Sequence, residues 1–208
     1  VVYCNVTVGA GMKLSTLCNF ALNHSCTGLE FAYGIPGTVG GAIYMNAGAY
    51  GGEMKDVLTS VEYLAADGNI VEVPAAELDL SYRHSIFEEN GGCILSATFR
   101  LKKGDAASIK ARMDELMQKR IDKQPLDKPS AGSTFKRPAG AFAAALIDQC
   151  GLRGYRHGGA AVSDKHCGFV VNLCNATCAD VVSLTEQVRQ IVLEKTGCTL
   201  EREIRVVE

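Results

Sequence analysis

The most unusual spacing in the sequence is a glycine-rich stretch. Such a stretch could bind a phosphate-bearing ligand. Positions 34–52 read GIPGTVGGAIYMNAGAYGG. Glycine lacks a Cβ, so its backbone reaches positive φ, lets a ligand approach closely, and in such turns presents amides that bind pyrophosphate. The spacing is not G-x-G-x-x-G, which argues against a Rossmann dinucleotide site. Plain tight turns would use the same glycines, and the residues alone leave both interpretations open.

Histidine and cysteine side chains suggest metal binding, and the tightest group is His166 and Cys167 with Cys174 and Cys178. The spacing is irregular and contains no C-x-x-C pair, so we predict no metal site. The nine cysteines are an odd number, scattered mostly through apolar stretches. We therefore expect buried, unreactive thiols in a reduced cytoplasmic protein.

Hydrophobic periodicity predicts the elements that would position these residues. Strands are predicted at residues 1–8, 60–65, 69–74, 93–101, 169–173 and 200–207, with a hairpin turn at Asp67-Gly68. Helices are predicted at residues 13–24, 109–123, 141–150 and 177–196. Strands and helices mix without strict alternation, which favours an α+β fold over a doubly wound sheet. A boundary near residues 102–108 divides the prediction into two lobes, 1–103 and 104–208.

Charge and composition exclude several classes of partner. The formal net charge of -2 over 208 residues gives no general attraction to nucleic acid or an anionic membrane. No apolar run approaches the roughly 20 residues of a membrane span. The first residues contain no secretory leader and no initiator Met, and they open on a predicted strand. We expect the natural chain to begin earlier.

Four blocks of the sequence resemble one enzyme family, the UDP-N-acetylenolpyruvoylglucosamine reductases. The run GLEF at 28–31 and the glycine-rich stretch through Glu53 resemble that family's flavin-contacting core. The blocks LSYRHSIF, PSAGSTFK and LEREIR, which start at positions 80, 129 and 200, resemble its Y-R-x-S-x-F, A-G-S-x-F-K and closing E-V-R blocks. The resemblance extends over essentially the whole chain. It implies a partial FAD-binding lobe of the vanillyl-alcohol-oxidase type and a C-terminal substrate-binding lobe, in the shorter type II form.

The resemblance also implies a reaction in peptidoglycan precursor synthesis. NADPH would reduce FAD, and the hydride would pass to an enolpyruvyl ether on UDP-N-acetylglucosamine, giving UDP-N-acetylmuramate. Hydride addition leaves negative charge on the substrate carboxylate, and the match assigns its stabilisation to Arg83. It assigns proton donation to Ser133 and polarisation of the enolpyruvyl group to Glu203. Without these motifs, Arg83 would be interpreted as a surface charge and Ser133 as a turn former.

Cofactor and substrate contacts follow from the same match. FAD is expected to contact Gly37, Thr38, Gly40, Gly41 and Asn46. The polar residues near the matched blocks are expected to bind the UDP diphosphate, namely Tyr82, Arg120, Gln124 and Lys136. Arg137 stands where many family members have Asn, so one nucleotide contact is expected to differ. His157 and His166 are expected to be hydrogen-bonded structural residues.

Three alternatives stay open at this point. Glu201 shares the predicted strand face of Glu203, which we prefer because the family's Glu also precedes an apolar-Arg pair.

The family's N-terminal lobe carries a further glycine-and-serine loop that we do not find, so we expect the N-terminal FAD-binding segment to be missing. The chain would then be either the enzyme without that segment or a non-catalytic fragment that binds the UDP-sugar. A flavin oxidase of the same superfamily is disfavoured by the Ser133 and Glu203 blocks, because an oxidase has no carbanion to protonate.

Overall fold

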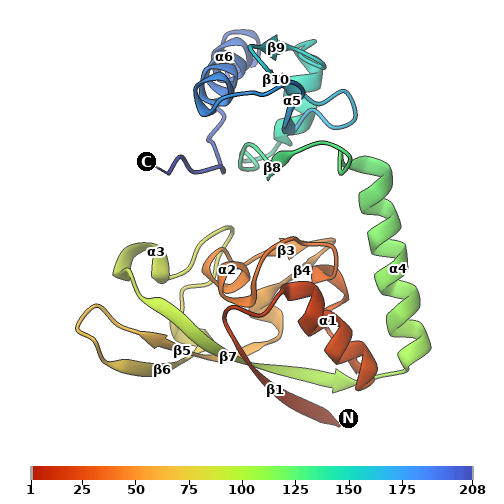
Figure 1. The fold of residues 1–208 in the computed structure, drawn as a ribbon, viewed down its shortest axis with the longest axis vertical. Helices are drawn as coiled ribbons and strands as arrows, with labels where there is room; N and C mark the ends of the chain where they lie inside the picture. The colour runs from red at the N-terminus through yellow and green to blue at the C-terminus, as the bar shows by residue number, and fades with distance from the viewer. Residues whose placement is uncertain (1, 208) are drawn as a thin grey trace. The chain divides into compact units, whose positions relative to one another are not determined.

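The computed structural model describes residues 2–207, and its two compact units divide between Arg120 and Ile121 (Figure 1). Helix α4, Ala106–Lys123, crosses this division. Ile109 and Met113 on α4 belong to the hydrophobic core of the first unit, which explains why most of the helix belongs to that unit. The lobes 1–103 and 104–208 were assigned separate functions from the sequence, and that assignment stays a prediction.

The first unit is built on an antiparallel sheet. Its strands lie in the order β1-β7-β5-β6, and β2 pairs with β7. Their bounds are β1 Tyr3–Gly9, β2 Cys26–Thr27, β5 Leu58–Leu64, β6 Ile70–Pro74 and β7 Cys93–Lys103. Gly68 has φ 87 between β5 and β6, so the predicted Asp-Gly hairpin turn is confirmed. The four strands predicted in this half of the chain are therefore all present.

Short helices pack against this sheet, and Figure 1 shows α1 and α2 on the same side of it. Their bounds are α1 Leu14–Asn23, α2 Val39–Tyr44 and α3 Phe87–Asn90, with 3-10 turns at Glu30–Ala32, Met54–Asp56 and Ala75–Glu77. α1 buries Leu14 and Leu17 completely, at the spacing that predicted the helix. Each of these burials contributes roughly 1.5–3 kcal/mol. A small hairpin of β3 (Gly48–Ala49) and β4 (Gly52–Glu53) follows α2.

The second unit combines a four-stranded antiparallel sheet with two helices. The strand order is β8-β11-β10-β9, with bounds β8 Ser130–Ser133, β9 Arg156–His157, β10 Ala160–Val162 and β11 Phe169–Asn172. The helices are α5 Ala143–Gln149 and α6 Cys178–Thr196. Thr177 and Asp180 form the predicted capping box of α6, and Gly197 ends the helix with φ 72. The mixed α+β architecture predicted from the sequence is confirmed.

The predicted closing strand at residues 200–207 is wrong. This segment has one isolated bridge, Phe135 with Arg202, flanked by a backbone hydrogen bond on each side. Continuing this register would set Ile204 and Arg205 against Ser133 and Gly132. The backbone of the C-terminal segment bends at Ile204, so this pairing does not continue.

The cysteine side chains only partly match expectation. All nine are free thiols, and Cys18, Cys26, Cys150 and Cys167 are buried as predicted. Cys93, Cys174 and Cys178 are exposed, so the expectation of burial is wrong for these three. Among residues 2–207, no group of three or more His, Cys, Asp or Glu side chains could hold a metal ion. Within the same range, no helix is both long and apolar enough to cross a membrane.

Candidate functional site

Arg83 occupies a strained turn in the first unit. The backbones of Ser81 and His84 exchange two hydrogen bonds of 3.3 Å, and Arg83 between them has φ 55. The left-handed conformation costs a non-glycine residue roughly 1–2 kcal/mol, and it persists only where the surroundings impose it. Ser85, which is fully buried, fixes the chain after the turn by donating its hydroxyl to the Tyr44 carbonyl at 2.7 Å.

The Arg83 side chain lies against the β3–β4 hairpin. Its Nη2 donates to the Gly48 carbonyl at 3.4 Å, and its Cζ lies 5.1 Å from the centre of the Tyr82 ring. Tyr82 itself is 46% exposed. The turn therefore presents a cation together with an exposed aromatic ring, two groups predicted to contact the substrate.

Asn46 connects the hairpin to the Arg83 turn. It is 1% exposed and has φ 38. Its Nδ2 donates to Glu53 Oε2 and to the Ser81 carbonyl, both at 2.9 Å, and its Oδ1 accepts from the Lys55 amide at 3.0 Å. All of these bonds are to other residues of the first unit, so the Asn46 side chain stabilises the hairpin and the turn from inside the protein.

Glu53 accepts one of the hydrogen bonds that Asn46 donates. Its Oε2 lies 2.9 Å from Lys55 Nζ, and its side chain is 31% exposed. The bond from Lys55 holds the pKa of Glu53 below its ordinary value, with smaller contributions from the Asn46 amide and the Arg83 charge. Glu53 is therefore ionised at neutral pH. Glu53 closes the glycine-rich stretch that resembles the family's flavin-contacting core, and the resemblance implies no role for it.

The glycine-rich stretch owes part of its composition to packing. A Cβ on Gly40 would lie 2.9 Å from the Cβ of Ala10, so only glycine lets α2 approach that loop. The amides of Val39 and Gly40 donate to the carbonyls of Met12 and Ala10, both at 2.9 Å, and the Gly41 amide donates to Thr38 Oγ1 at 3.3 Å. These three amides are thus bonded within the protein.

Gly37 and Gly41 differ from Gly40 in being exposed. Gly37 has φ 130, and a Cβ built on it would meet nothing within 4 Å. The surface from Gly37 through Thr38 to Gly41 is therefore open, and a flat ligand has access to it through glycine backbone. Packing therefore explains Gly40, whereas ligand binding at Gly37 and Gly41 stays a prediction.

Arg120 lies at the end of the first unit and packs beside the same stretch. A Cβ on Gly34 would lie 2.8 Å from Arg120 Cδ, so the arginine stem rests against glycine backbone. Burial lowers the pKa of the Arg120 guanidinium, and the neighbouring Tyr50 partly offsets this. Among the described residues, no carboxylate forms an ion pair with Arg120. An anionic ligand would supply the missing partner.

In the second unit, Thr134 holds Ser133 and Glu203 on neighbouring segments. Thr134 is 2% exposed, its amide donates to the Gly168 carbonyl at 2.8 Å, and its Oγ1 accepts from the Val170 amide at 3.0 Å. Its carbonyl accepts from the Glu203 amide at 2.9 Å. Ser133, an exposed residue, ends β8 opposite Phe169. Two residues that are 70 positions apart in the sequence are thereby brought together.

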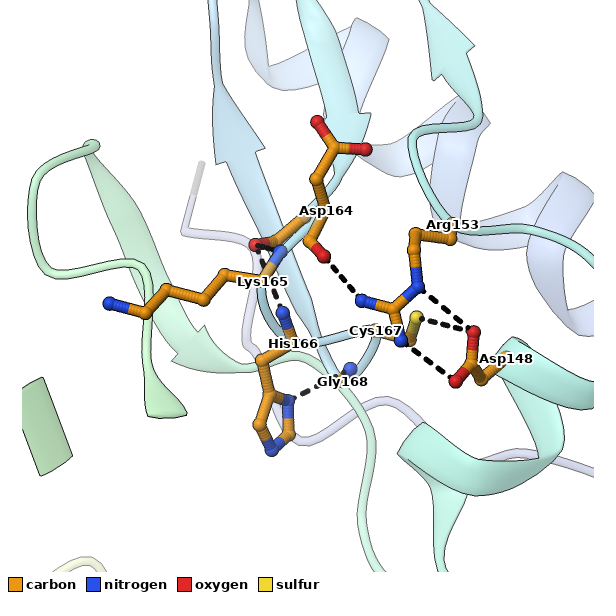
Figure 2. Close-up of polar contacts among 8 residues, drawn as sticks. Asp148, Arg153, Asp164, Lys165, His166, Cys167 and Gly168 are labelled. Carbon is orange, nitrogen blue, oxygen red and sulfur yellow. Dashed lines mark hydrogen bonds and ion pairs between the residues drawn. The ribbon is translucent and has the colours of Figure 1, made fainter. Parts of the chain in front are cut away.

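The turn after β10 supports this arrangement, and Figure 2 shows how it is held. Arg153 donates Nε and Nη2 to the two Asp148 carboxylate oxygens at 3.1 and 2.7 Å, and Nη1 to the Asp164 carbonyl. His166 Nδ1 accepts from the Gly168 amide at 3.1 Å, so the ring hydrogen resides on Nε2. Burial lowers the pKa of His166. The turn thus fixes Gly168, whose carbonyl bonds Thr134.

The remaining predicted residues of this unit lie on its surface. Lys136 Nζ forms an ion pair of 2.6 Å with Glu201 Oε1, and Glu201 is 69% exposed. Gln124 is half-buried beside the buried Pro125. His157 Nδ1 lies 3.0 Å from the Gln187 amide nitrogen. The prediction that both His157 and His166 are hydrogen-bonded is confirmed.

Comparison with known proteins gives the same family over both units. Residues 124–207 match the model of the UDP-N-acetylenolpyruvoylglucosamine reductase C-terminal domain, and residues 3–74 match that of an FAD binding domain. A reductase of this name from Limosilactobacillus reuteri is 50% identical over 202 residues, which are 97% of this chain and 68% of that protein. The chain belongs to the UDP-N-acetylenolpyruvoylglucosamine reductase family.

Two further members of the reductase family can be compared with this chain in length. The Lachnoclostridium phytofermentans reductase is 56% identical to 97% of this chain, which spans 65% of that relative's length. The crystal structure of the Thermus caldophilus reductase superposes with a TM-score of 0.87 at 39% identity, covering 97% of this chain and 72% of that one. The predicted family and fold class are confirmed.

The predicted site residues divide between the two units. Arg83, Tyr82, Arg120 and the glycine-rich stretch belong to the first unit, whereas Ser133, Glu203, Gln124 and Lys136 belong to the second. Sequence reasoning missed Thr134 and Glu53. Both could have been found from the sequence: Thr134 lies within a block that matches the family, and Glu53 is the acidic residue that closes the glycine-rich stretch.

Proposed function

We propose that the chain carries the catalytic and substrate-binding residues of an NADPH-driven, FAD-dependent reductase. The product would be UDP-N-acetylmuramate, made from UDP-N-acetylenolpyruvoylglucosamine for peptidoglycan precursors. The observation that carries the proposal is membership of the reductase family across both units, at 50% identity over 202 residues. Nine free thiols fit a reducing compartment, so we assign the reaction to the cytoplasm.

The residues of the first unit fit an FAD contact. When bound, FAD supplies the hydride that it takes from NADPH and passes to the enolpyruvyl carbon. Gly37, Thr38 and Gly41 would contact it, because they are exposed and the two glycines have no Cβ. Gly40 and Asn46 are buried and would shape that surface from within.

Arg83 would stabilise the charge that develops on the substrate. Hydride addition to the terminal enolpyruvyl carbon moves the double-bond electrons onto the neighbouring carbon and its carboxylate. A guanidinium held in place before the reaction stabilises that anion without reorganising. The left-handed backbone and the bond from Nη2 to the Gly48 carbonyl support this role, because both restrict the arginine.

Ser133 and Glu203 would complete the reduction. The Ser133 hydroxyl donates its proton to the carbanionic carbon, so the alkoxide that remains must recover a proton from its surroundings. Glu203 is proposed to polarise the enolpyruvyl group. The link through Thr134 supports this pairing.

The diphosphate of the substrate would bind Tyr82, Arg120, Gln124 and Lys136. Arg120 supports this most strongly, since its half-buried cation has no carboxylate partner among the described residues. Lys136 would have to exchange its bond to Glu201 for one to the ligand.

Visible absorption spectroscopy tests the proposal. Protein incubated with FAD should retain a flavin spectrum after gel filtration, lose the colour with NADPH under argon, and regain it when the enolpyruvyl substrate is added. A colourless protein whose melting temperature rises with the UDP-sugar would instead be a substrate-binding fragment. Colour that returns with oxygen but not with this substrate would indicate an oxidase.

A further inference from the structure

We propose that Glu53 is the positioning residue of Arg83. Its carboxylate holds the Arg83 guanidinium over the β3–β4 hairpin, and Lys55 compensates the negative charge of Glu53. The inference rests on the role proposed for Arg83. It adds a residue that carries no assigned function and that does not itself need to touch the substrate.

The hairpin places the carboxylate of Glu53 beside the group that Arg83 contacts. Gly48 and Glu53 are directly opposite each other in the β3–β4 pair. The Gly48 carbonyl accepts from Arg83 Nη2 at 3.4 Å. A Cβ on Gly48 would lie 2.8 Å from Glu53 Cγ, so the Glu53 side chain passes over the glycine. One rung of the hairpin thus carries the carbonyl that Arg83 contacts and, opposite it, a carboxylate whose pKa the Arg83 charge helps to lower.

Asn46 fixes the turn to that carboxylate. One amide nitrogen bonds Glu53 Oε2 and the Ser81 carbonyl, each at 2.9 Å, so the carboxylate and the start of the Arg83 turn share a single donor group. Because Asn46 is 1% exposed, water does not compete for these bonds. The position of the Arg83 backbone is therefore coupled to that of Glu53.

Lys55 explains how a carboxylate serves here without cancelling the arginine. Its Nζ lies 2.9 Å from Glu53 Oε2, and the pKa of Lys55 is raised by that bond. Two cations and one carboxylate leave a net charge of +1 in the cluster of Lys55, Glu53 and Arg83. Arg83 keeps a positive field for an anionic ligand, and its orientation is restricted by a negative neighbour.

Glu53→Gln in the flavin-loaded protein is the direct test, because it removes the charge and keeps the shape and one acceptor oxygen. We expect kcat for substrate reduction to fall between about tenfold and a hundredfold at unchanged KM, since orientation matters most in the transition state. Flavin reduction by NADPH should stay within about twofold, because it does not use Arg83. Glu53→Asp, which keeps the charge, should recover part of the lost kcat.

Asp56→Asn is the matched control. Asp56 ends the 3-10 turn Met54–Asp56, which directly follows β4, and accepts from the Glu53 amide at 2.8 Å, so this variant loses an equal charge and keeps an acceptor oxygen for that amide. Its kcat should stay within about twofold of the parent. Equal losses in Glu53→Gln and Asp56→Asn would show a general effect on the hairpin and would overturn the proposal.

A second readout needs no activity. The side-chain Nε–H signal of Arg83, assigned by its loss in Arg83→Lys, reports guanidinium order by nuclear magnetic resonance in the chain itself. Glu53→Gln should shift this signal towards that of a solvated arginine, and Asp56→Asn should leave it in place. If the chemical shift of this signal does not change in Glu53→Gln, the inference is wrong, whether or not the chain is a reductase. Absence of substrate reduction in the parent protein, with the signal moving as described, would sink the proposed function alone.

Discussion

The amide of Glu203 donates to the carbonyl of Thr134 at 2.9 Å, which ties the C-terminal segment to the residue that follows Ser133. Thr134 is buried and uses its amide and hydroxyl in bonds to Gly168 and Val170 on one segment, and its carbonyl in the bond to Glu203 on another. A change in the position of Thr134 would therefore move Ser133 and Glu203 together. The two proposed catalytic residues are thus linked through the backbone of Thr134.

Ser133→Ala should separate the two halves of the reaction. Reduction of bound flavin by NADPH should proceed at the parent rate, whereas reduction of the enolpyruvyl substrate should fall by about 10²–10⁴-fold for lack of a positioned acid. Stopped-flow absorbance of the flavin measures both steps. Ser130→Ala removes a hydroxyl from the same exposed strand and serves as the control. Substrate reduction at the parent rate in Ser133→Ala would contradict the assignment.

Asn46→Ala should destabilise the first unit markedly. The substitution leaves the Ser81 carbonyl and the Lys55 amide without their partner in a buried place, at a cost of about 2–4 kcal/mol. Urea unfolding followed by circular dichroism measures the free energy of unfolding. Asn5→Ala, at an exposed position of β1, should change that energy by less than about 0.5 kcal/mol. Equal effects of the two variants would show that the Asn46 network contributes little.

Elements with a strong periodic pattern were predictable from the sequence. α1 and α6 have apolar residues at helical spacing, and α6 adds a capping box and a terminal glycine. α2 was not predicted, since two of its six residues are glycine, and each glycine costs a helix about 1 kcal/mol. It forms because Thr38 caps it locally and because Gly40 packs on Ala10, which lies 30 positions earlier in the sequence.

The candidate site was predictable only as a set of residue types. Nothing in the sequence around Arg83 indicates a left-handed backbone, because the turn contains no glycine. That conformation depends on Asn46 and Ser85, which bond to groups 35 and 41 positions away. The predicted closing strand is reduced to the one bridge of Arg202 with Phe135, and the backbone bends at Ile204, which the alternating pattern does not indicate. Long-range partners determine such details, and a linear pattern does not contain them.

Thiol reactivity should follow burial along the chain. Burial in the first core raises the pKa of Cys18 to about 12, with the charge of Glu30 acting in the same direction. At pH 8 its thiolate fraction is then roughly one in ten thousand, and the thiolate is the reactive form. Iodoacetamide labelling mapped by mass spectrometry should modify the exposed Cys93, Cys174 and Cys178 first. Denatured protein should label at all nine positions, and labelling of native Cys18 as fast as Cys93 would refute the expectation.

Acid should weaken the second unit through His166. Its neutral ring accepts a bond from the Gly168 amide and contacts Phe169 edge to face at 5.0 Å. Burial lowers its pKa in the folded state, and the nearby Arg153 and Lys123 charges add to this. The unfolded chain therefore binds a proton more readily than the folded one. This contribution to stability is complete above the ordinary histidine pKa of about 6.5 and is lost as the pH falls towards the lower folded value.

His166→Gln isolates this effect from other titrating groups, because its side-chain oxygen still accepts from the Gly168 amide and does not titrate. The difference in unfolding midpoint between parent and variant should be constant above pH 7 and should change in the variant's favour as the pH falls to 5. His24→Gln, on the exposed end of α1, provides the control with no such trend. Because the Gly168 carbonyl accepts from the Thr134 amide, the protection factor of that amide against hydrogen exchange should fall in the parent at low pH and not in the variant. Parallel midpoint curves for parent and His166→Gln would show that His166 keeps an ordinary pKa in the folded protein.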